Sequence, residues 1–236
     1  MAILEPIARR SAESLALDRL RDAVLTGKLP AGARLTEMAL ADQLATSRAT
    51  IRTALHHLVA EGLAVQVPYT GWMVTSLTAN DAWELVTLRA SLESLAASLA
   101  AERATPDARV ALGAAFDKLA VTASSRKPAQ ATAADFAFHR AIIASAGHDR
   151  LVEHYRRVSQ QISVLIASSN ALMSDPSLLV GQHEPLYKAV VAGKPDKAAV
   201  LARRHVEDEG AKLIAHLRKA ERAVAAPTVR RKELKS

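Results

Sequence analysis

The stretch TSRATIRTALHHLVAEGL, residues 46–63, contains the pattern that decides the fold. Its apolar residues recur every three or four positions, which predicts a helix that begins at Ser47. Serine is a favourable residue at the start of a helix, and Gly62 suits the turn that ends it. Arg48 and Arg52 are four residues apart, so both side chains project from the same outward face.

These two arginines need an anionic partner. The N-terminus of a helix already carries a partial positive charge, so two more cations there disfavour an isolated helix. An arriving phosphate reverses the balance, because backbone N–H groups and guanidinium groups then converge on it. An arginine can also donate to the edge of a guanine in the major groove. The alternative is that both are ordinary solvated side chains, and the neighbouring segments decide between these interpretations.

The segments around this helix predict a winged helix-turn-helix. Residues 11–25 have one apolar stripe and predict a first helix, which a turn with two glycines and a proline ends. Residues 36–44 predict a second, short helix. Two short apolar segments, 63–67 and 71–75, follow the helix of Arg48 and predict a hairpin. We therefore expect a DNA-binding domain over residues 1–76.

The rest of the chain predicts helices alone. No strand pattern occurs from residue 77 to 222, and the apolar periods are long. The expected helices are 78–103, 107–124, 129–146, 148–171, 176–193 and 195–221. We expect a mainly α protein, in which a C-terminal all-α antiparallel bundle of about six helices follows the winged domain.

Composition restricts the class of protein. The chain has 236 residues and no cysteine, which excludes a disulfide scaffold. It has no apolar run of about 18 residues, so we expect a soluble, cytoplasmic protein and no membrane partner. The formal net charge is +7. Much of the excess lies near the C-terminus, where residues 223–236 are expected to form a basic, disordered tail.

Four residues of the second part could bind a metal ion. Asp135 and His139 are four residues apart and therefore share one face of a helix. His183 and His205 fall on later helices that an antiparallel bundle can bring to the same interior site. Three imidazoles and one carboxylate suit Zn²⁺, Ni²⁺ or Mn²⁺. The alternative is that these histidines are structural or exposed, as we expect for His56, His57, His154 and His216.

Residues 20–74 resemble the N-terminal domain of GntR-type bacterial transcription regulators. The shared elements are the motifs G-x-L-x-x-G-x-R-L, L-A-x-x-x-x-x-S-R-x-x-I-R-x-A-L and L-x-x-E-G-L. The resemblance implies that this domain binds operator DNA and that the wing enters the minor groove. The residues expected at the DNA are Arg34, Ser47, Arg48, Thr50, Arg52 and Gly71. The chain departs from the family pattern at Ala49 and in a wing that contains Tyr69 and Trp72.

Residues 80–220 resemble the FCD ligand-binding domain of the FadR branch of this family. The shared motifs are D-x-x-F-H-x-x-I, H-E-x-L-x-x-A-V-x-A-G and A-A-x-x-A-R-R-H. The metal ligands that the resemblance implies are Asp135, His139, His183 and His205.

Three other residues of the second part have expectations of their own. Family members often have an arginine at the position of Arg89, where it could hold the carboxylate of an organic acid. The alternative for Arg89 is a surface ion pair with Glu93. Pro185 follows His183 by two residues and predicts a kink or a late start of that helix. His148 is expected at a helix end.

Three functions remain to be separated. The first is a homodimeric transcription regulator, expected to be a repressor, whose operator affinity depends on a small carboxylate bound near the metal ion. The second is a hydrolase-like enzyme that uses the Asp/His site, but no general base is evident, and we expect no enzymatic activity. The third is an architectural DNA-binding protein, which predicts neither metal nor effector.

Overall fold

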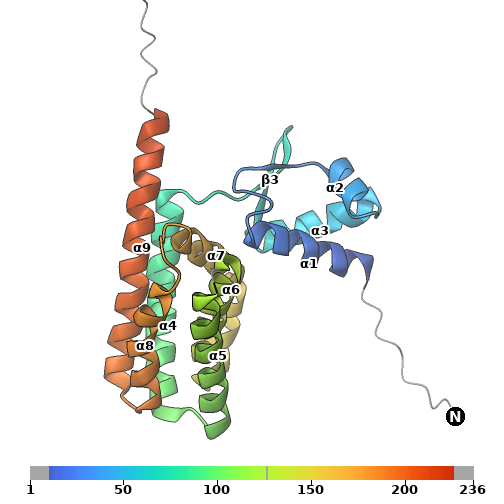
Figure 1. Cartoon of the computed structure of the whole chain (residues 1–236). Helices are drawn as coiled ribbons and strands as arrows, with labels where there is room; N and C mark the ends of the chain where they lie inside the picture. The colour runs from blue at the N-terminus through green and yellow to red at the C-terminus, as the bar shows by residue number, and fades with distance from the viewer. Residues whose placement is uncertain (1–10, 126, 226–236) are drawn as a thin grey trace, which may run out of the picture.

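The computed structural model describes residues 11–125 and 127–225 of the chain. They form a winged N-terminal part beside one end of a helical bundle (Figure 1). The expected mainly α fold, with a winged helix-turn-helix and an all-α C-terminal bundle, is confirmed.

The N-terminal part contains three helices and a small sheet. Its elements are α1 (Ala12–Leu25), β1 (Arg34–Leu35), α2 (Glu37–Gln43), α3 (Arg48–Ala60), β2 (Ala64–Val67) and β3 (Gly71–Val74). The antiparallel sheet has the strand order β1-β3-β2, and Arg34 pairs with Met73. The sequence did not predict β1, because a strand of two residues has no period.

Local capping and apolar burial explain α3. The Ser47 side chain accepts a hydrogen bond from the backbone N–H of Thr50 at 3.0 Å, which fixes the start of the helix. Ile51, Leu55 and Leu58 are completely buried on the opposite face. The arginines of the first two turns consequently face outward.

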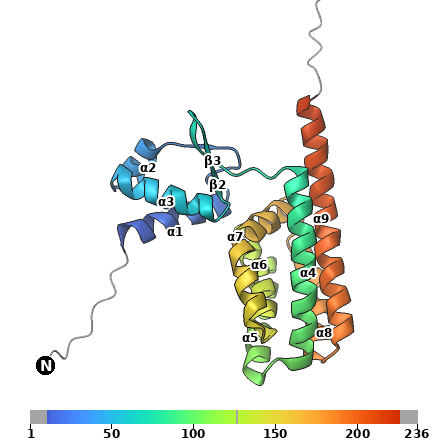
Figure 2. The same ribbon diagram turned by 180° about the vertical axis from the view of Figure 1, so that it is seen from behind.

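The C-terminal part is a bundle of helices. Its elements are α4 (Ala79–Arg103), α5 (Pro106–Ser124), α6 (Pro128–Ser145), α7 (Asp149–Asn170), α8 (Leu178–Val191) and α9 (Pro195–Ala225). The two longest, α4 and α9, lie side by side in both ribbon views (Figures 1 and 2). The Ser94 hydroxyl on α4 donates to the Ala199 carbonyl on α9 at 3.0 Å. At Gly210, a Cβ would lie 2.4 Å from Val86, so only glycine permits this close packing.

Three helix ends can be compared with the sequence predictions: the start of α8, the end of α9 and the position of His148. Helix α8 begins at Leu178, two residues later than predicted, and it continues through Pro185. Helix α9 extends to Ala225 and so includes the first residues of the expected tail; residues 226–236 lie outside the described residues. His148 lies at a helix end as predicted, and its Nδ1 accepts the backbone N–H of Leu151 at 3.2 Å.

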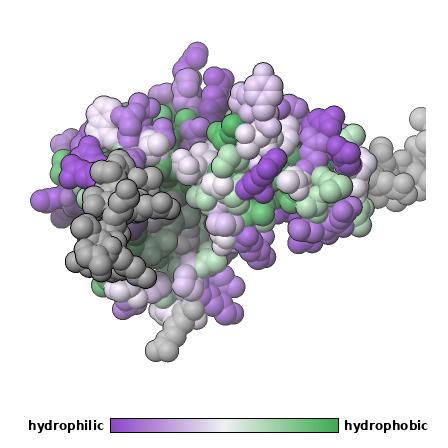
Figure 3. Space-filling model, turned by 90° about the horizontal axis from the view of Figure 1, so that it is seen from above, coloured by the Kyte–Doolittle hydropathy of each residue, from purple (hydrophilic) through white to green (hydrophobic). Residues whose placement is uncertain are grey.

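The winged part contacts the bundle through α7. Val164 of α7 packs against the apolar core of the winged part. Gly62, at φ +72°, approaches Gln161 so closely that a Cβ would lie 2.3 Å from the amide nitrogen. Seen from above, hydrophilic and hydrophobic side chains are mixed over both parts (Figure 3). Within the described ranges, the helices are too short or too polar to cross a lipid bilayer.

Candidate functional sites

The bundle brings the four predicted metal ligands together. Asp135 and His139 come from α6, His183 from α8 and His205 from α9. The candidate ligand nitrogens of the three histidines all lie within 4.8 Å of one another. Nε2 of His183 is 3.0 Å from Nε2 of His139, and Asp135 Oδ1 is 2.9 Å and 3.2 Å from these two nitrogens. Asp135, His139 and His183 are buried, and His205 keeps some exposed surface.

The groups that contact the Nδ1 atoms of His183 and His139 determine which ring nitrogens face the site. Nδ1 of His183 lies 2.7 Å from the Leu179 carbonyl, which can only accept, so Nδ1 carries the proton. Nδ1 of His139 lies 2.8 Å from Oε2 of Glu93, and this carboxylate favours a proton on Nδ1, although the angle is poor for a hydrogen bond. When both imidazoles are neutral, their Nε2 atoms therefore present lone pairs to each other.

This arrangement fits a bound cation. Two nitrogen lone pairs and a carboxylate oxygen that meet at 2.9–3.2 Å repel one another unless a proton or a metal ion lies between them. Asp135 Oδ1 has no hydrogen-bond partner, whereas Oδ2 accepts from Asn170 Nδ2 at 2.7 Å. Ligand atoms about 2.1 Å from one metal ion would be about 3.0–3.4 Å apart. The donor set and its spacing thus suit Zn²⁺, Ni²⁺ or Mn²⁺.

A buried charge network adjoins the histidines. Arg89 is 4% and Glu93 2% exposed, and Arg89 Nε donates to Glu93 Oε1 at 2.8 Å. The hydroxyl of Tyr155, on α7, donates to the same oxygen at 2.9 Å. The alternative expected for Arg89 was an ion pair with Glu93 at the surface. The pair forms, but it is buried, so the expected location is wrong. Nη2 of Arg89 is buried and has no hydrogen-bond partner, so its two N–H bonds remain for another acceptor.

Burial and charge act in opposite directions on these groups. Burial raises the pKa of Asp135, but the adjacent His183 and His139 hold the pKa well below its ordinary value. Burial raises the pKa of Glu93, and Arg89 and His139 outweigh this effect, so its pKa is also lowered. Burial and the adjacent histidines lower the pKa of His205. Burial lowers the pKa of His139, but Glu93 and Asp135 outweigh this effect and raise it, so a metal ion would have to displace a proton from this imidazole. The carboxylates, held ionised, and His205, held neutral, are in the forms that bind metal ions.

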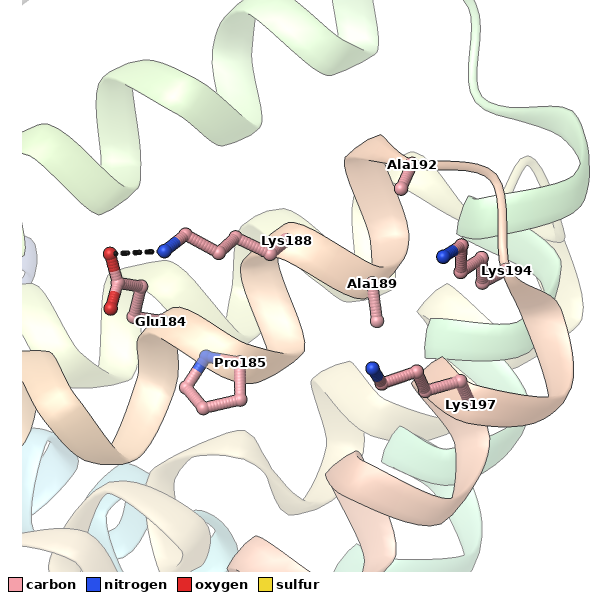
Figure 4. A pocket seen from close by; sticks show the side chains of 7 residues that line it. All are labelled: Glu184, Pro185, Lys188, Ala189, Ala192, Lys194 and Lys197. Carbon is pink, nitrogen blue, oxygen red and sulfur yellow. Dashed lines mark ion pairs between the residues drawn. The ribbon is translucent and has the colours of Figure 1, made fainter.

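Pro185 does not separate His183 from the other ligands. Figure 4 shows its ring on α8 beside a surface hollow of about 370 Å³, close to the ion pair of Glu184 and Lys188. His183 lies on the buried face of the same helix.

Four of the six predicted DNA contacts line one hollow on the winged part. A hollow of about 490 Å³ is lined by Arg34, Arg48, Arg52 and Gly71, among others. Ser47 and Thr50, at the start of α3, do not line this hollow, and their hydroxyl oxygens are 2.8 Å apart. Gly71 begins β3 at φ +100°, a conformation that favours glycine.

Sequence reasoning missed several partners of these residues. In the winged part, Glu37 accepts hydrogen bonds from Arg52 and Trp72. In the bundle, Tyr155 and Asn170 contact Glu93 and Asp135. Each of these contacts joins different elements, so residue spacing gave no signal for it. His56, His57, His154 and His216 are exposed, as expected.

The comparisons with known proteins agree with both parts. The model of bacterial regulatory proteins of the gntR family matches residues 14–74, and the FCD domain model matches residues 84–208. A Paenarthrobacter nicotinovorans protein named "Probable D-xylose utilization operon transcriptional repressor" is 28% identical over 209 residues, which cover 86% of this chain and 91% of that protein. The HTH-type transcriptional repressor GlaR of Escherichia coli is 27% identical over 201 residues, covering 79% and 89%.

A solved structure has the same architecture. A GntR transcriptional regulator from Rhodococcus sp. RHA1 superimposes with a TM-score of 0.75 at 23% identity, covering 87% of this chain and 99% of that one. With a winged helix-turn-helix that matches the gntR model and a bundle that matches the FCD model over more than half of its length, the chain belongs to the GntR family of DNA-binding transcription regulators, in the branch that contains an FCD domain.

Proposed function

We propose that the protein is a repressor that binds operator DNA through α3 and the wing and releases it when a small carboxylate binds in the bundle beside a divalent metal ion. The observation that carries this proposal is the convergence of three histidines and Asp135 inside a bundle joined to a winged helix-turn-helix. Two relatives with similar overall length are named as repressors.

The four ligands proposed are Asp135, His139, His183 and His205. A bound Zn²⁺, Ni²⁺ or Mn²⁺ would neutralise these donors and leave a position for an oxygen of the effector. Asn170 orients Asp135 by donating to Oδ2, which turns Oδ1 toward the histidines. Leu179 and Glu93 orient His183 and His139 through their Nδ1 atoms.

Arg89 is the residue proposed to bind the effector carboxylate. Its unpartnered Nη2 lies in the buried network that Arg89 forms with Glu93. Glu93 holds only Nε of Arg89 and balances its charge, so the two N–H bonds of Nη2 stay available as donors to the effector carboxylate. We therefore expect it to contribute orientation and selectivity for an anion.

The proposed DNA contacts are Arg34, Ser47, Arg48, Thr50, Arg52 and Gly71. Arg48 is exposed at the N-terminus of α3, where a phosphate or a base edge can reach it. Gly71 has no side chain to obstruct the wing at the minor groove. Since DNA binding regulates transcription in the cytoplasm of bacteria, we place the protein there.

A homodimer fits this function and has a candidate surface on α4. Leucines at alternating spacings of three and four form one stripe along this helix, the pattern of a helix that packs on another helix; they are Leu85, Leu88, Leu92, Leu95 and Leu99. Leu88 is 44% and Leu95 47% exposed. Helix α4 lies in front of the bundle in Figure 2. A twofold pairing would cover the stripe and place two copies of α3 on successive half-sites.

The primary experiment combines DNA binding with metal and effector binding. Arg48→Ala should abolish specific operator binding in a mobility-shift assay while metal content and thermal shifts with organic acids remain unchanged. DNA binding that is unchanged by this variant would contradict the role of α3. Metal-free protein that still responds to organic acids would contradict the proposed effector site.

The same preparations test the hydrolase alternative and the dimer. Metal-dependent turnover that survives deletion of residues 1–76 would favour an enzyme. Leu88→Lys with Leu95→Lys should give a monomer by light scattering, whereas lysines at the exposed Val110 and Val121 of α5 should not change the mass. A dimer that tolerates the α4 lysines would exclude this surface.

A further inference from the structure

The DNA-facing surface contains a carboxylate that the proposed DNA contacts do not require. Glu37 is the first residue of α2, and its side chain is 16% exposed. Its Oε1 accepts from Nε of Arg52 at 2.8 Å, and its Oε2 accepts from Nη2 at 2.7 Å. Both oxygens of Glu37 therefore hold one edge of the guanidinium group.

The wing holds Glu37 in this position. Nε1 of Trp72, on β3, donates to Glu37 Oε1 at 3.3 Å. Trp72 is 5% exposed, and the ring of His56 on α3 packs edge-on against it at 4.7 Å. Helices α2 and α3 and the wing thus meet at one carboxylate, and Trp72 is a residue at which the wing departs from the family pattern.

A negative charge at this place needs a reason, because it opposes the approach of DNA phosphates. An arginine that only binds a phosphate does not need a neighbouring carboxylate, since arginine–phosphate contacts tolerate many orientations of the guanidinium group. An arginine that distinguishes bases must hold its guanidinium plane in one orientation to donate to two acceptors.

The geometry of Arg52 agrees with the second role. With Nε and one N–H of Nη2 bound to Glu37, Nη1 and the other N–H of Nη2 remain free as a pair. Arg48 differs, because its Nη2 is 3.9 Å from Glu37 and its side chain is 66% exposed. Only one of the two arginines of α3 is therefore held by both carboxylate oxygens.

We propose that Glu37, held by Trp72, is a specificity-determining residue that positions Arg52 to donate two hydrogen bonds to O6 and N7 of a guanine in the operator. The proposal rests on the proposed binding of operator DNA by α3 and assigns to it a positioning residue and a base.

The test begins with DNA that the wild-type protein selects from a random-sequence pool. Dissociation constants are then measured for the selected duplex and for a scrambled one. Glu37→Gln should reduce the preference for the selected duplex by about ten-fold or more, the value of a bidentate arginine–guanine contact. Affinity for the scrambled duplex should stay equal or increase, because a negative charge is lost. Asp42→Asn removes the same charge from an exposed position of α2 and should leave the preference unchanged.

Replacing single guanines of the selected duplex by 7-deazaguanine identifies the base. The wild type should lose affinity at one guanine in each half-site, and Glu37→Gln should be much less sensitive there. Trp72→Phe keeps the aromatic packing but loses the N–H donor, and it should give a smaller loss of preference. This second variant also decides the question if Glu37→Gln does not fold.

The outcomes separate this proposal from the proposed function. If Arg48→Ala abolishes selective binding while Glu37→Gln and Trp72→Phe retain the full preference and the 7-deazaguanine effect, the positioning role of Glu37 is wrong and operator binding by α3 stands. If the wild type selects no sequence, both fail.

Discussion

Two arginine–glutamate pairs in this protein have the same contact length in opposite surroundings. Arg52 meets Glu37 on the surface proposed to bind DNA, with hydrogen bonds of 2.8 and 2.7 Å and side chains 53% and 16% exposed. Arg89 meets Glu93 inside the bundle at 2.8 Å, with side chains 5% and 2% exposed. The distances alone do not reveal that these pairs have different roles.

Water accounts for the difference. Solvent and salt screen the exposed pair, so it contributes little to folding stability, and its effect is to orient Arg52. The buried pair has lost its hydration, and either partner alone would be a charge without compensation in the protein interior. We therefore expect stability to depend on Glu93 and DNA recognition to depend on Glu37.

The largest expected effect comes from breaking the buried pair. Glu93→Ala should lower the free energy of unfolding by about 3–5 kcal/mol, because Arg89 remains buried without its counter-charge. Tyr155 also loses the acceptor of its hydroxyl. Urea unfolding followed by circular dichroism measures the change.

Two further variants identify charge as the cause. Glu153→Ala breaks contacts of an exposed glutamate with Arg156 and Arg157, and it should change stability little. Arg89→Met with Glu93→Leu removes both buried charges and should recover much of the loss. A small effect of Glu93→Ala would show that the interior tolerates the unpaired arginine.

Metal addition has the next largest effect. Saturating chelator-treated protein with Zn²⁺, Ni²⁺ or Mn²⁺ at a hundred times the dissociation constant should stabilise it by about 2.7 kcal/mol. His183→Ala should remove the stabilisation, since it deletes a buried ligand, and His154→Ala should retain it, since this histidine is exposed. Calorimetric titration with thermal unfolding measures both quantities. An unchanged response of His183→Ala would place the metal ion elsewhere.

The sequence predicted the features that helix geometry fixes locally. The period of residues 47–60 gave α3 and its outward arginines. The spacing of Asp135 and His139 placed them on one face of α6. His183 and His205 were candidates because an antiparallel bundle can bring later helices to the same interior site, and the resemblance to FCD domains implied all four ligands. The structure brings them together.

The surroundings of these residues could not be predicted in the same way. Glu37 lies on α2 and Arg52 on α3, and a turn joins the two helices. Their contact therefore depends on the angle between these helices, which residue spacing does not give. On α4 the leucine stripe would suggest the face that is buried in the bundle. In the structure Leu88 and Leu95 of this stripe are exposed, and Arg89 and Glu93 are buried instead. Alanines make up most of the buried face of α4, because helices in this bundle pack closely. Apolar periodicity alone does not show which face of the helix is buried.

Acid should weaken the protein through the same buried pair. The pKa of Glu93 in the folded protein lies below its ordinary 4.5, because Arg89 and His139 outweigh the effect of burial. Below pH 4.5 the unfolded chain therefore binds a proton that the folded chain does not. The stability from Glu93 is present above this pH and is lost as pH falls, by at most about 1.4 kcal/mol per pH unit. Urea unfolding between about pH 3 and 6 should show a flatter profile for Glu93→Gln; a profile equal to that of the wild type would assign the acid sensitivity to other carboxylates such as Asp135.

The smallest effect on folding should come from Glu37→Gln. Its partner Arg52 stays in water whether or not the carboxylate is charged, so the melting temperature should remain within about 2 °C of the wild type. Differential scanning calorimetry in low and high salt measures this, with Glu93→Gln as the buried counterpart. If Glu37→Gln destabilises the protein as much as Glu93→Gln does, the exposed pair has a structural role and the contrast between the two pairs fails. If the melting temperature is unchanged while base discrimination falls, orientation of Arg52 is the function that the carboxylate serves.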